Sequence, residues 1–405
     1  MFSFLLKLLH SCPHYIPQVT KIAAAQCVAQ ALKACFETYL DRPCLGSRTG
    51  LDRAEGYTWL TFEQVYRRCR AVAWSMRHRC HLVPGEDVIC IYAETSVTWY
   101  IAQYTCLLHG YLVVPVPAGT DPQALAHIME RSEAACLITS ARLRRHVANA
   151  LLYMSWAPGR QPVVICMDDG PRMSPAATSA ADTIDKFGDF AFKTLLTEGA
   201  KEGLTGSNIP VGLHQDKDRP VMLLPTSGSS GIPKLCIVTD SMLLRRCRPP
   251  RFGAPMILYS RLPLRQSVDV LSSGGRIGVC SGGVDRLRDD LRLLRPTVFG
   301  DVPAFWQDLQ QEFLSDLRVV ADGGEAADSE VREGLVRAWR NKRILGNRCK
   351  IIIIGGATAS SDLKYWMWEV FECQVIDGYG TTEVGGVAAG GVAAGGDILP
   401  GWCSN

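Results

Sequence analysis

Short apolar segments alternate with helix-like stretches along most of this 405-residue chain. In the first part, the predicted strands cover residues 87–92, 111–116, 135–139 and 162–167. Apolar side chains recur with a helical period in the segments between them, at residues 60–79, 98–108 and 122–131. Strands that are apolar on both faces belong to parallel sheets covered by helices on both sides. The sequence therefore predicts an α/β fold with layered, parallel-rich sheets flanked by helices.

The same alternation returns in the second half of the chain. Predicted strands there cover residues 221–224, 234–239, 256–259, 276–280, 350–354 and 373–376. Predicted helices cover residues 286–294, 307–340 (with a Gly-rich interruption at 322–325) and 361–371. Residues 168–220 are rich in Ser, Ala, Asp, Gly and Lys with weak periodicity, which predicts a surface excursion or linker. Residues 385–396 repeat a five-residue Gly/Ala/Val pattern of low complexity.

Composition excludes several classes of protein. The 43 Lys and Arg residues against 40 Asp and Glu give a net charge of +3, too balanced for a non-specific nucleic-acid binder. None of the 16 cysteines forms a C-x-x-C pair, so buried free thiols in a reducing compartment are favoured over a metal site or a disulfide scaffold. We therefore expect a cytoplasmic protein, with no run of 18 apolar residues to span a membrane.

The first ten residues place Phe2, Leu5, Leu6 and Leu9 on one face of a helix. Ten residues are too short to cross a bilayer, and the basic start of a signal peptide is missing. Two interpretations stay open: a helix that packs on its own domain, which we favour, and an amphipathic helix that makes peripheral contact with a membrane.

The strongest local signal is the segment Thr226–Lys234, which we call the phosphate loop. It follows a predicted strand and combines hydroxyl side chains with two glycines before its lysine. Glycines let backbone N–H groups point into one concavity, hydroxyls add donors, and Lys234 adds a mobile positive charge. Because Lys234 follows Pro233 and precedes a strand, the segment is not a Walker A motif. The chemistry predicts a polyphosphate-binding loop, against the alternative of a flexible surface loop.

Two further motifs follow strands in the second half. The segment Asp377–Glu383, here called the GYG segment, offers an aromatic face at Tyr379, a hydroxyl at Thr382 and a hard oxygen ligand for Mg²⁺ at Glu383. The segment Gly355–Ala357, here called the glycine turn, lets a ligand approach the backbone. Ligands collect at the ends of strands in open parallel sheets. Each motif taken alone is also explained by a simple strand-to-helix turn.

Taken in order, the three motifs resemble those of the acyl-adenylating (AMP-binding) superfamily, which includes acyl-CoA synthetases, luciferases and peptide-synthetase adenylation domains. Further similarity to long-chain fatty-acid CoA ligases and to the adenylation domain of carboxylic acid reductases lies at residues 42–46, 57–68, 95–97, 295–297 and 302–306. The reductases are slightly closer, through residues 95–97, the GYG segment and a helical insert at 329–346. The resemblance runs from about residue 40 to about residue 385.

The resemblance implies a reaction in which a carboxylate attacks the α-phosphate of ATP, and a thiol then displaces AMP from the acyl-adenylate. It implies a fatty acid as substrate, Mg²⁺ as metal, and coenzyme A or a carrier-protein phosphopantetheine as acceptor. Lys234 and Thr382 would contact phosphates, Glu383 would bind Mg²⁺, and these three are the catalytic candidates. The implied nucleotide-binding residues are Thr226, Ser227, Gly228, Ser229, Ser230, Gly231, Lys234, Gly356, Ala357, Asp377, Gly378, Tyr379, Gly380 and Thr382.

The sequence departs from the family pattern in two places. The segment Leu262–Gln266 stands where relatives carry a proline followed by a histidine, and it has no histidine, although Arg265 is present. After Glu383 the pattern stops, and the lid domain with the family lysine is not found. We therefore expect a helical extension at residues 1–39, an incomplete adenylation domain at 40–384 and a Gly/Ala-rich tail at 385–405.

Three interpretations follow from these departures. The first is that the chain is a fragment or truncated product of a catalytic acyl-adenylating enzyme, which could include downstream carrier and reductase domains. The second is a degenerate, non-catalytic relative that binds a nucleotide or acyl group. The third is an unrelated α/β protein or scaffold with chance motifs.

Overall fold

The chain divides into two compact units. The first contains residues 1–46, 59–255 and 261–279, and the second contains residues 47–58, 256–260 and 280–405. The structure is a computed structural model, and the residues it describes are 21–48, 56–155, 161–167, 190–202, 216, 218–226, 232–245, 257–260, 266–282, 284–320, 329–342, 344–381, 385–392 and 398–403. Each unit is described below by itself.

A seven-stranded sheet forms the centre of the first unit. Its strands, in spatial order, are β7 (Phe190–Ala191), β6 (Val163–Met167), β5 (Ala134–Ser140), β3 (Val88–Tyr92), β4 (Leu112–Val116), β8 (Pro220–Thr226) and β9 (Lys234–Thr239). Neighbouring strands are parallel except β8 and β9, which form an antiparallel pair. All five residues of β3 are buried, as expected for a strand covered on both faces.

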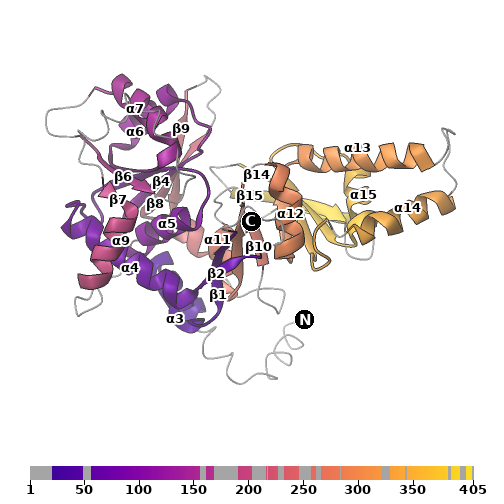
Figure 1. The fold of residues 1–405 in the computed structure, drawn as a ribbon, viewed down its shortest axis with the longest axis horizontal. Helices are drawn as coiled ribbons and strands as arrows, with labels where there is room; N and C mark the ends of the chain where they lie inside the picture. Colours follow the sequence, from indigo (N-terminus) through magenta and orange to yellow (C-terminus); the bar gives the residue numbers. More distant parts are fainter. Residues whose placement is uncertain are drawn as a thin grey trace. The chain divides into compact units, whose positions relative to one another are not determined.

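Helices cover both faces of this sheet (Figure 1). Helices α6 (Pro122–Ser132) and α7 (Arg144–Tyr153) pack over one face, and α5 (Val97–His109) and α9 (Phe192–Glu202) lie on the other, with α4 (Phe62–His78) against them. A short 3₁₀ turn, η1 (Ala141–Leu143), precedes α7. Helix α4 begins after a capping box, in which Gln64 N donates to Thr61 Oγ1 at 3.2 Å and Thr61 N donates to Gln64 Oε1 at 3.0 Å. The predicted helix-covered parallel sheet is confirmed.

The segment expected as an excursion contains a regular helix, so that prediction is wrong for residues 190–202. Ser75 Oγ of α4 donates to Leu195 O of α9 at 2.6 Å, and Leu195 is fully buried. A Cβ added at Gly199 would lie 1.8 Å from Ala71 O, so the two helices approach closely at that glycine. The polar composition of the surrounding segment hid a short amphipathic helix. The rest of the predicted excursion, up to residue 215, lies outside the described residues.

Helix α3 (Val28–Thr38) also belongs to the first unit, and its side chains Leu32, Cys35 and Phe36 are fully buried. The helix lies within the predicted extension at residues 1–39, forms part of the core and contacts α10 (Asp240–Leu244) and α11 (Gln266–Ser272). The remaining elements are β1 (Pro43–Ser47), whose last residue falls in the second unit, β2 (Thr58–Thr61), whose first residue does, and β11 (Arg276–Val279), which is parallel to β1. The predicted helix over residues 1–10 lies outside the described residues.

The second unit contains a sheet with four parallel strands, β10 (Ile257–Ser260), β12 (Val298–Asp301), β13 (Ile351–Gly355) and β14 (Gln374–Thr381). Its helices are α12 (Val284–Leu294), α13 (Pro303–Val320), α14 (Ser329–Asn341) and α15 (Ser361–Phe371). The last three helices share an aromatic core in which Phe313 contacts Trp339 and Trp366 edge-on, with ring centroids 5.5 and 5.9 Å apart.

The Gly/Ala repeat also forms regular structure. Residues Gly385–Val392 form β15, which pairs antiparallel with β14, and Ile398–Cys403 form β16, which pairs antiparallel with β15. The repeat alone indicated a low-complexity tail beginning at residue 385. Glycine and alanine carry little strand preference, so backbone pairing with β14 specifies this strand, and the composition does not reveal it.

Candidate nucleotide-binding site

The phosphate loop connects the two strands of an antiparallel hairpin in the first unit. Thr226, the last residue of β8, is the register partner of Lys234, the first residue of β9, and Thr226 Oγ1 lies 3.4 Å from Lys234 O. The strand pairing therefore holds the two ends of the loop opposite each other. The predicted strands on either side of the loop are confirmed.

Lys234 is exposed at the start of β9, the edge strand of its sheet. Among the described residues, no carboxylate forms an ion pair with its ammonium group. An exposed ammonium group beside a loop whose sequence is rich in hydroxyl side chains suits an anionic ligand. Residues Ser227–Gly231, which complete the predicted loop, lie outside the described residues.

The glycine turn and the start of the GYG segment come together at the carboxyl ends of two neighbouring strands in the second unit. Strands β13 and β14 are parallel, and Gly355 is the register partner of Gly378. A Cβ added at Gly355 would lie 2.8 Å from Gly378 O, so only glycine allows this approach of the two backbones. Gly356 has a φ of 86°, in the region that favours glycine. Both predicted motifs therefore lie at one edge of one sheet.

The residues at this edge of the sheet are accessible to solvent. Gly356 and Ala357 are exposed, and Asp377 and Gly378 are partly buried. Exposed backbone groups at the carboxyl ends of parallel strands are the usual position for a ligand in an α/β fold. Strand β14 continues through Tyr379 and Gly380, with a register shift against β15 between them, while the side chain of Tyr379 lies outside what the structure describes.

An ion pair holds the first residue of the GYG segment. Lys364 Nζ of α15 lies 2.8 Å from Asp377 Oδ2, and the two side chains are 19% and 26% exposed. The sequence carries no signal for Lys364, which stands thirteen positions before Asp377 in a helix with no motif of its own. Only the packing of α15 beside β14 reveals the pair. Its effect is to neutralise a carboxylate next to backbone predicted to face an anionic nucleotide.

Several predicted residues lie outside the described part of the chain. Thr382 and Glu383, the candidates for phosphate and Mg²⁺ contacts, belong to this group, and so does Arg265, in the segment where relatives carry a histidine. Within the described residues, no group of three or more His, Cys, Asp or Glu side chains is arranged for a metal ion. The roles of Thr382 and Glu383 therefore stay predictions from the sequence.

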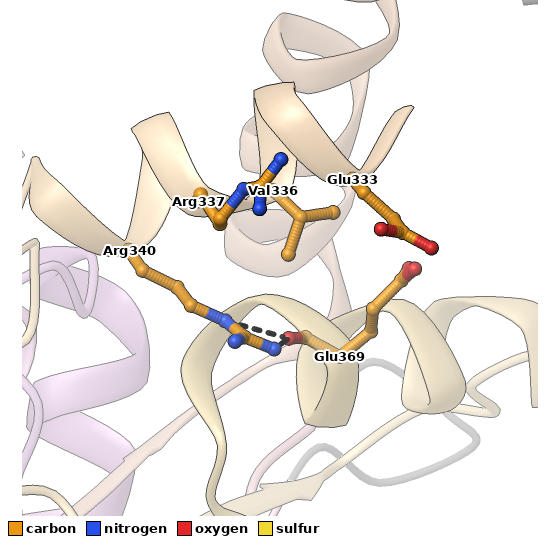
Figure 2. A pocket seen from close by; sticks show the side chains of 5 residues that line it. All are labelled: Glu333, Val336, Arg337, Arg340 and Glu369. Atoms are coloured by element: carbon orange, nitrogen blue, oxygen red, sulfur yellow. Dashed lines mark hydrogen bonds between the residues drawn. The ribbon is translucent and has the colours of Figure 1, made fainter. Parts of the chain in front are cut away.

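A hollow of about 260 Å³ lies between α14 and α15 (Figure 2). Its lining residues are Glu333, Val336, Arg337, Arg340 and Glu369. Two of these charged residues have partners, since Arg340 Nη2 donates to Glu369 O at 2.7 Å and the neighbouring Arg332 pairs with the Glu369 carboxylate. None of the predicted nucleotide-binding residues lines this hollow.

Two other predictions concern cysteines and membranes. The thirteen cysteines whose side chains the structure describes are free thiols, and all except Cys280 and Cys349 are buried, as the sequence predicts. Across the described ranges, no helix is both long and apolar enough to cross a bilayer.

Comparison with known proteins places this fold and these motifs in one family. Residues 32–401 match the family model described as AMP-binding enzyme, so the chain belongs to the AMP-binding enzyme family. The match begins within α3 and continues through β15 into β16. It therefore extends past residue 384, where the recognisable sequence motifs end.

The curated relatives are acyl-CoA ligases and a reductase. Long-chain-fatty-acid–CoA ligase 1 of Cavia porcellus is 22% identical over 370 residues, which cover 84% of this chain and 51% of the ligase. Long-chain-fatty-acid–CoA ligase 6 of Rattus norvegicus is 25% identical over 376 residues, with the same coverage of 84% and 51%. Carboxylic acid reductase of Mycobacterium tuberculosis is 25% identical over 390 residues, or 88% of this chain and 32% of the reductase.

Solved structures show the same fold. The A-PCP didomain of carboxylic acid reductase from Segniliparus rugosus, in complex with AMP, has a TM-score of 0.77 and 21% identity, covering 95% of this chain and 58% of that one. The adenylation domain of a carboxylate reductase from Mycobacterium chelonae has a TM-score of 0.78 and 18% identity, covering 97% and 64%. The chain spans about half the length of the ligases it matches, and less of the reductase.

Proposed function

We propose that this chain binds ATP and activates a carboxylic acid, in the first instance a fatty acid, as an acyl-adenylate. A carboxylate oxygen of the acid attacks the α-phosphorus of ATP, and the bond to pyrophosphate breaks. In the second half-reaction a thiol sulfur attacks the acyl carbon and AMP leaves. Membership of the AMP-binding family and the ligase and reductase relatives support this reaction class.

The observation that carries the proposal is the pairing of Thr226 with Lys234 across the mouth of the phosphate loop. Both reactants of the first step are anions, so the protein must mainly supply positive charge and alignment. Lys234 and the loop amides would hold the β- and γ-phosphates, and the exposed backbone at Gly356 and Gly378 would line the nucleotide.

Mg²⁺ and the acceptor are further parts of this proposal. A Mg²⁺ ion bound at Glu383 would offset charge that develops on the transferring phosphate, with Thr382 at the α-phosphate. The acceptor is coenzyme A or the phosphopantetheine of a carrier protein. The second choice would make this chain the adenylation part of a carboxylic acid reductase. We assign the activation step to the large adenylation domain. The sequence motifs predict this domain at residues 40–384, and the match to the family model extends to residue 401.

Pyrophosphate exchange tests the activation step directly. Labelled pyrophosphate is incubated with ATP, Mg²⁺, the full chain and a panel of fatty and aromatic acids. We expect exchange that depends on the acid, and ATP binding that is measurable by calorimetry. Replacing Lys234 with Ala removes a charged phosphate contact worth about 1.5–3 kcal/mol and should weaken ATP binding by about 10- to 100-fold. Lys193→Ala, at an exposed lysine of α9 in the same unit, is the matched control.

A second candidate function is nucleotide binding without catalysis. The observation that favours it is the sequence Leu262–Gln266, which lacks the histidine of the family pattern. ATP binding without exchange for any acid would select this second function. If Lys234→Ala and Glu383→Gln both bind ATP as well as the wild type does, the assignment of the site itself is wrong.

A further inference from the structure

Two cysteines stand together at the amino ends of neighbouring strands in the second unit. Cys349 lies two residues before β13, and Cys373 lies directly before β14. The strands are parallel from the pair Ile351 and Gln374 onward, and Gln374 N donates to Lys350 O at 3.0 Å just before that pair. The strand register therefore brings the two cysteines to the same edge of the sheet, opposite the edge that carries the glycine turn.

The two cysteines contact each other. Cys373 Sγ lies 3.3 Å from Cys349 O and 3.1 Å from Phe371 O. Cys349 Sγ lies 3.3 Å from Ile351 O. Both cysteines are free, so the pair is a reduced dithiol. A disulfide requires two side chains that already approach in this way, since a bond between distant cysteines would need backbone movement.

The two members of the pair differ in their access to solvent. Cys373 is 1% exposed, whereas Cys349 is partly exposed. The hydrogen bond with Cys349 and burial raise the pKa of the Cys373 thiol far above its ordinary value, which keeps this thiol protonated. Oxidation follows access and thiolate character, so Cys349 is the member that an oxidant reaches first.

We propose that Cys349 and Cys373 form an oxidisable dithiol that closes to a disulfide when the protein meets a peroxide. The Cys349 thiolate attacks one oxygen of hydrogen peroxide, the O–O bond breaks, and the products are Cys349 sulfenic acid and hydroxide. The Cys373 sulfur then attacks the Cys349 sulfur, the S–O bond breaks, and hydroxide leaves. The Cys373 proton and this hydroxide form water. Two thiols are oxidised by two electrons, and the peroxide is reduced. This inference does not rest on the proposed ATP-dependent function.

Cys280 provides the matched control. Among the described cysteines it is the other partly exposed one, and its Sγ contacts Gly282 O, within its own turn. It shares the solvent access of Cys349 without a thiol at hydrogen-bond distance in the described part of the chain. If oxidation depended on solvent access alone, Cys280 and Cys349 would be oxidised alike. If Cys349 and Cys373 form a dithiol, only Cys349 would form a disulfide.

The experiment treats the folded full chain with hydrogen peroxide, blocks remaining thiols with N-ethylmaleimide and digests without reduction for mass spectrometry. We expect a peptide pair linked through Cys349 and Cys373, lost on treatment with dithiothreitol. The link should be absent from Cys349→Ser and unchanged in Cys280→Ser. In Cys373→Ser, the Cys349 sulfenic acid should persist and react with dimedone. The wild-type measurement needs no variant to fold. The proposal is overturned if Cys280 is oxidised while wild-type Cys349 and Cys373 stay unlinked, or if linkage appears only after unfolding in urea.

Discussion

Lys364 Nζ lies 2.8 Å from Asp377 Oδ2, and this ion pair joins helix α15 to strand β14 where the GYG segment begins. The two side chains are 19% and 26% exposed, so solvent screens the pair less than it screens a surface pair. A bare carboxylate at this position would repel the phosphates of a bound nucleotide. For the nucleotide proposed above, the pair would therefore present a neutral edge.

The first prediction concerns this charge balance. Lys364→Met leaves Asp377 uncompensated and should weaken ATP binding by about fivefold, which corresponds to about 1 kcal/mol for a partly exposed pair. The double variant Lys364→Met with Asp377→Asn removes both charges and should recover most of the affinity. Isothermal titration with MgATP measures all three proteins. A double variant that binds as weakly as Lys364→Met would show that Lys364 acts through packing or the fold, and not through the charge of Asp377.

The second prediction concerns the glycine turn. Gly356 has a φ of 86°, and an alanine there pays about 1–2 kcal/mol for a left-handed backbone. An added Cβ would find Val302 Cγ1 only at 3.8 Å, so the cost is conformational and not a clash. Gly356→Ala should therefore lower the free energy of unfolding by about 1–2 kcal/mol and weaken ATP binding.

Gly334→Ala is the matched control for this change. Gly334 lies in α14, where an added Cβ meets nothing within 4 Å, so alanine should stabilise the helix by up to about 1 kcal/mol. Urea unfolding measures both variants. Equal stability of Gly356→Ala and the wild type would contradict the strained turn.

Much of the fold could be predicted from the sequence, because strands such as β3 and β13 consist almost entirely of apolar residues, and this composition predicts that they are buried. The cap at Thr61 is likewise a local feature, since it depends on two residues three positions apart. Helix α9 was missed because its apolar face is short and stands in a polar segment. Its position depends on a close contact between Gly199 and Ala71, more than a hundred residues away, which no local pattern encodes.

The candidate site divides in the same way. The phosphate loop and the GYG segment were visible because each combines glycines with polar side chains within a few residues, and the glycine turn was visible because it directly follows an apolar strand. The ion pair of Lys364 with Asp377 and the contact of Cys349 with Cys373 were not visible, because strand register and helix packing create them. Single charged or sulfur side chains in helices and loops give no local signal for a partner in another element.

The third prediction concerns a buried ion pair in the second unit. Arg48 Nη1 lies 2.8 Å from Asp290 Oδ1, with both side chains at most 1% exposed, and Ser281 donates to Asp290 through N at 2.9 Å and Oγ at 2.7 Å. Arg48→Met would leave a buried carboxylate without its cation and should cost about 3–5 kcal/mol of unfolding free energy. Asp290→Asn would likewise remove the carboxylate that pairs with the Arg48 guanidinium. Urea unfolding of the two single variants and the double variant measures their coupling.

The double variant Arg48→Met with Asp290→Asn should be more stable than the sum of the single losses implies, because neither charge then stays alone. Lys33→Met is the control, since Lys33 and Glu37 form an exposed pair at 43% and 54% exposure and the change should stay within about 0.5 kcal/mol. Strict additivity of the two buried substitutions would show that Arg48 and Asp290 do not stabilise the fold as a pair.

The fourth prediction is a pH dependence of stability with a defined sign. Burial raises the pKa of Asp240 above its ordinary value of 3.8, against the opposing effects of the Val28 N–H, which donates to Asp240 Oδ1 at 2.9 Å, and of the Arg219 charge. A carboxyl group whose folded pKa is raised stabilises the fold below its unfolded pKa, and this stabilisation is lost as the pH rises through the folded pKa. Asp240→Asn keeps the acceptor and removes the titration. The difference in unfolding free energy between variant and wild type should therefore shift in favour of the variant as the pH rises from 3.8.

Asp316→Asn should show the opposite slope. Hydrogen bonds from Lys342 and Trp339 lower the pKa of Asp316 below 3.8, so its stabilisation is present above that pH and is lost as the pH falls through the folded pKa. Relative to the wild type, Asp316→Asn should lose stability between acid and neutral pH, while Asp240→Asn gains it. Urea unfolding at a series of pH values from 3 to 7 measures both variants under one protocol. The titration of all other groups is common to both variants. If the unfolding free energies of the two variants, each relative to the wild type, changed with pH in the same direction, the opposite pKa shifts of Asp240 and Asp316 would be contradicted.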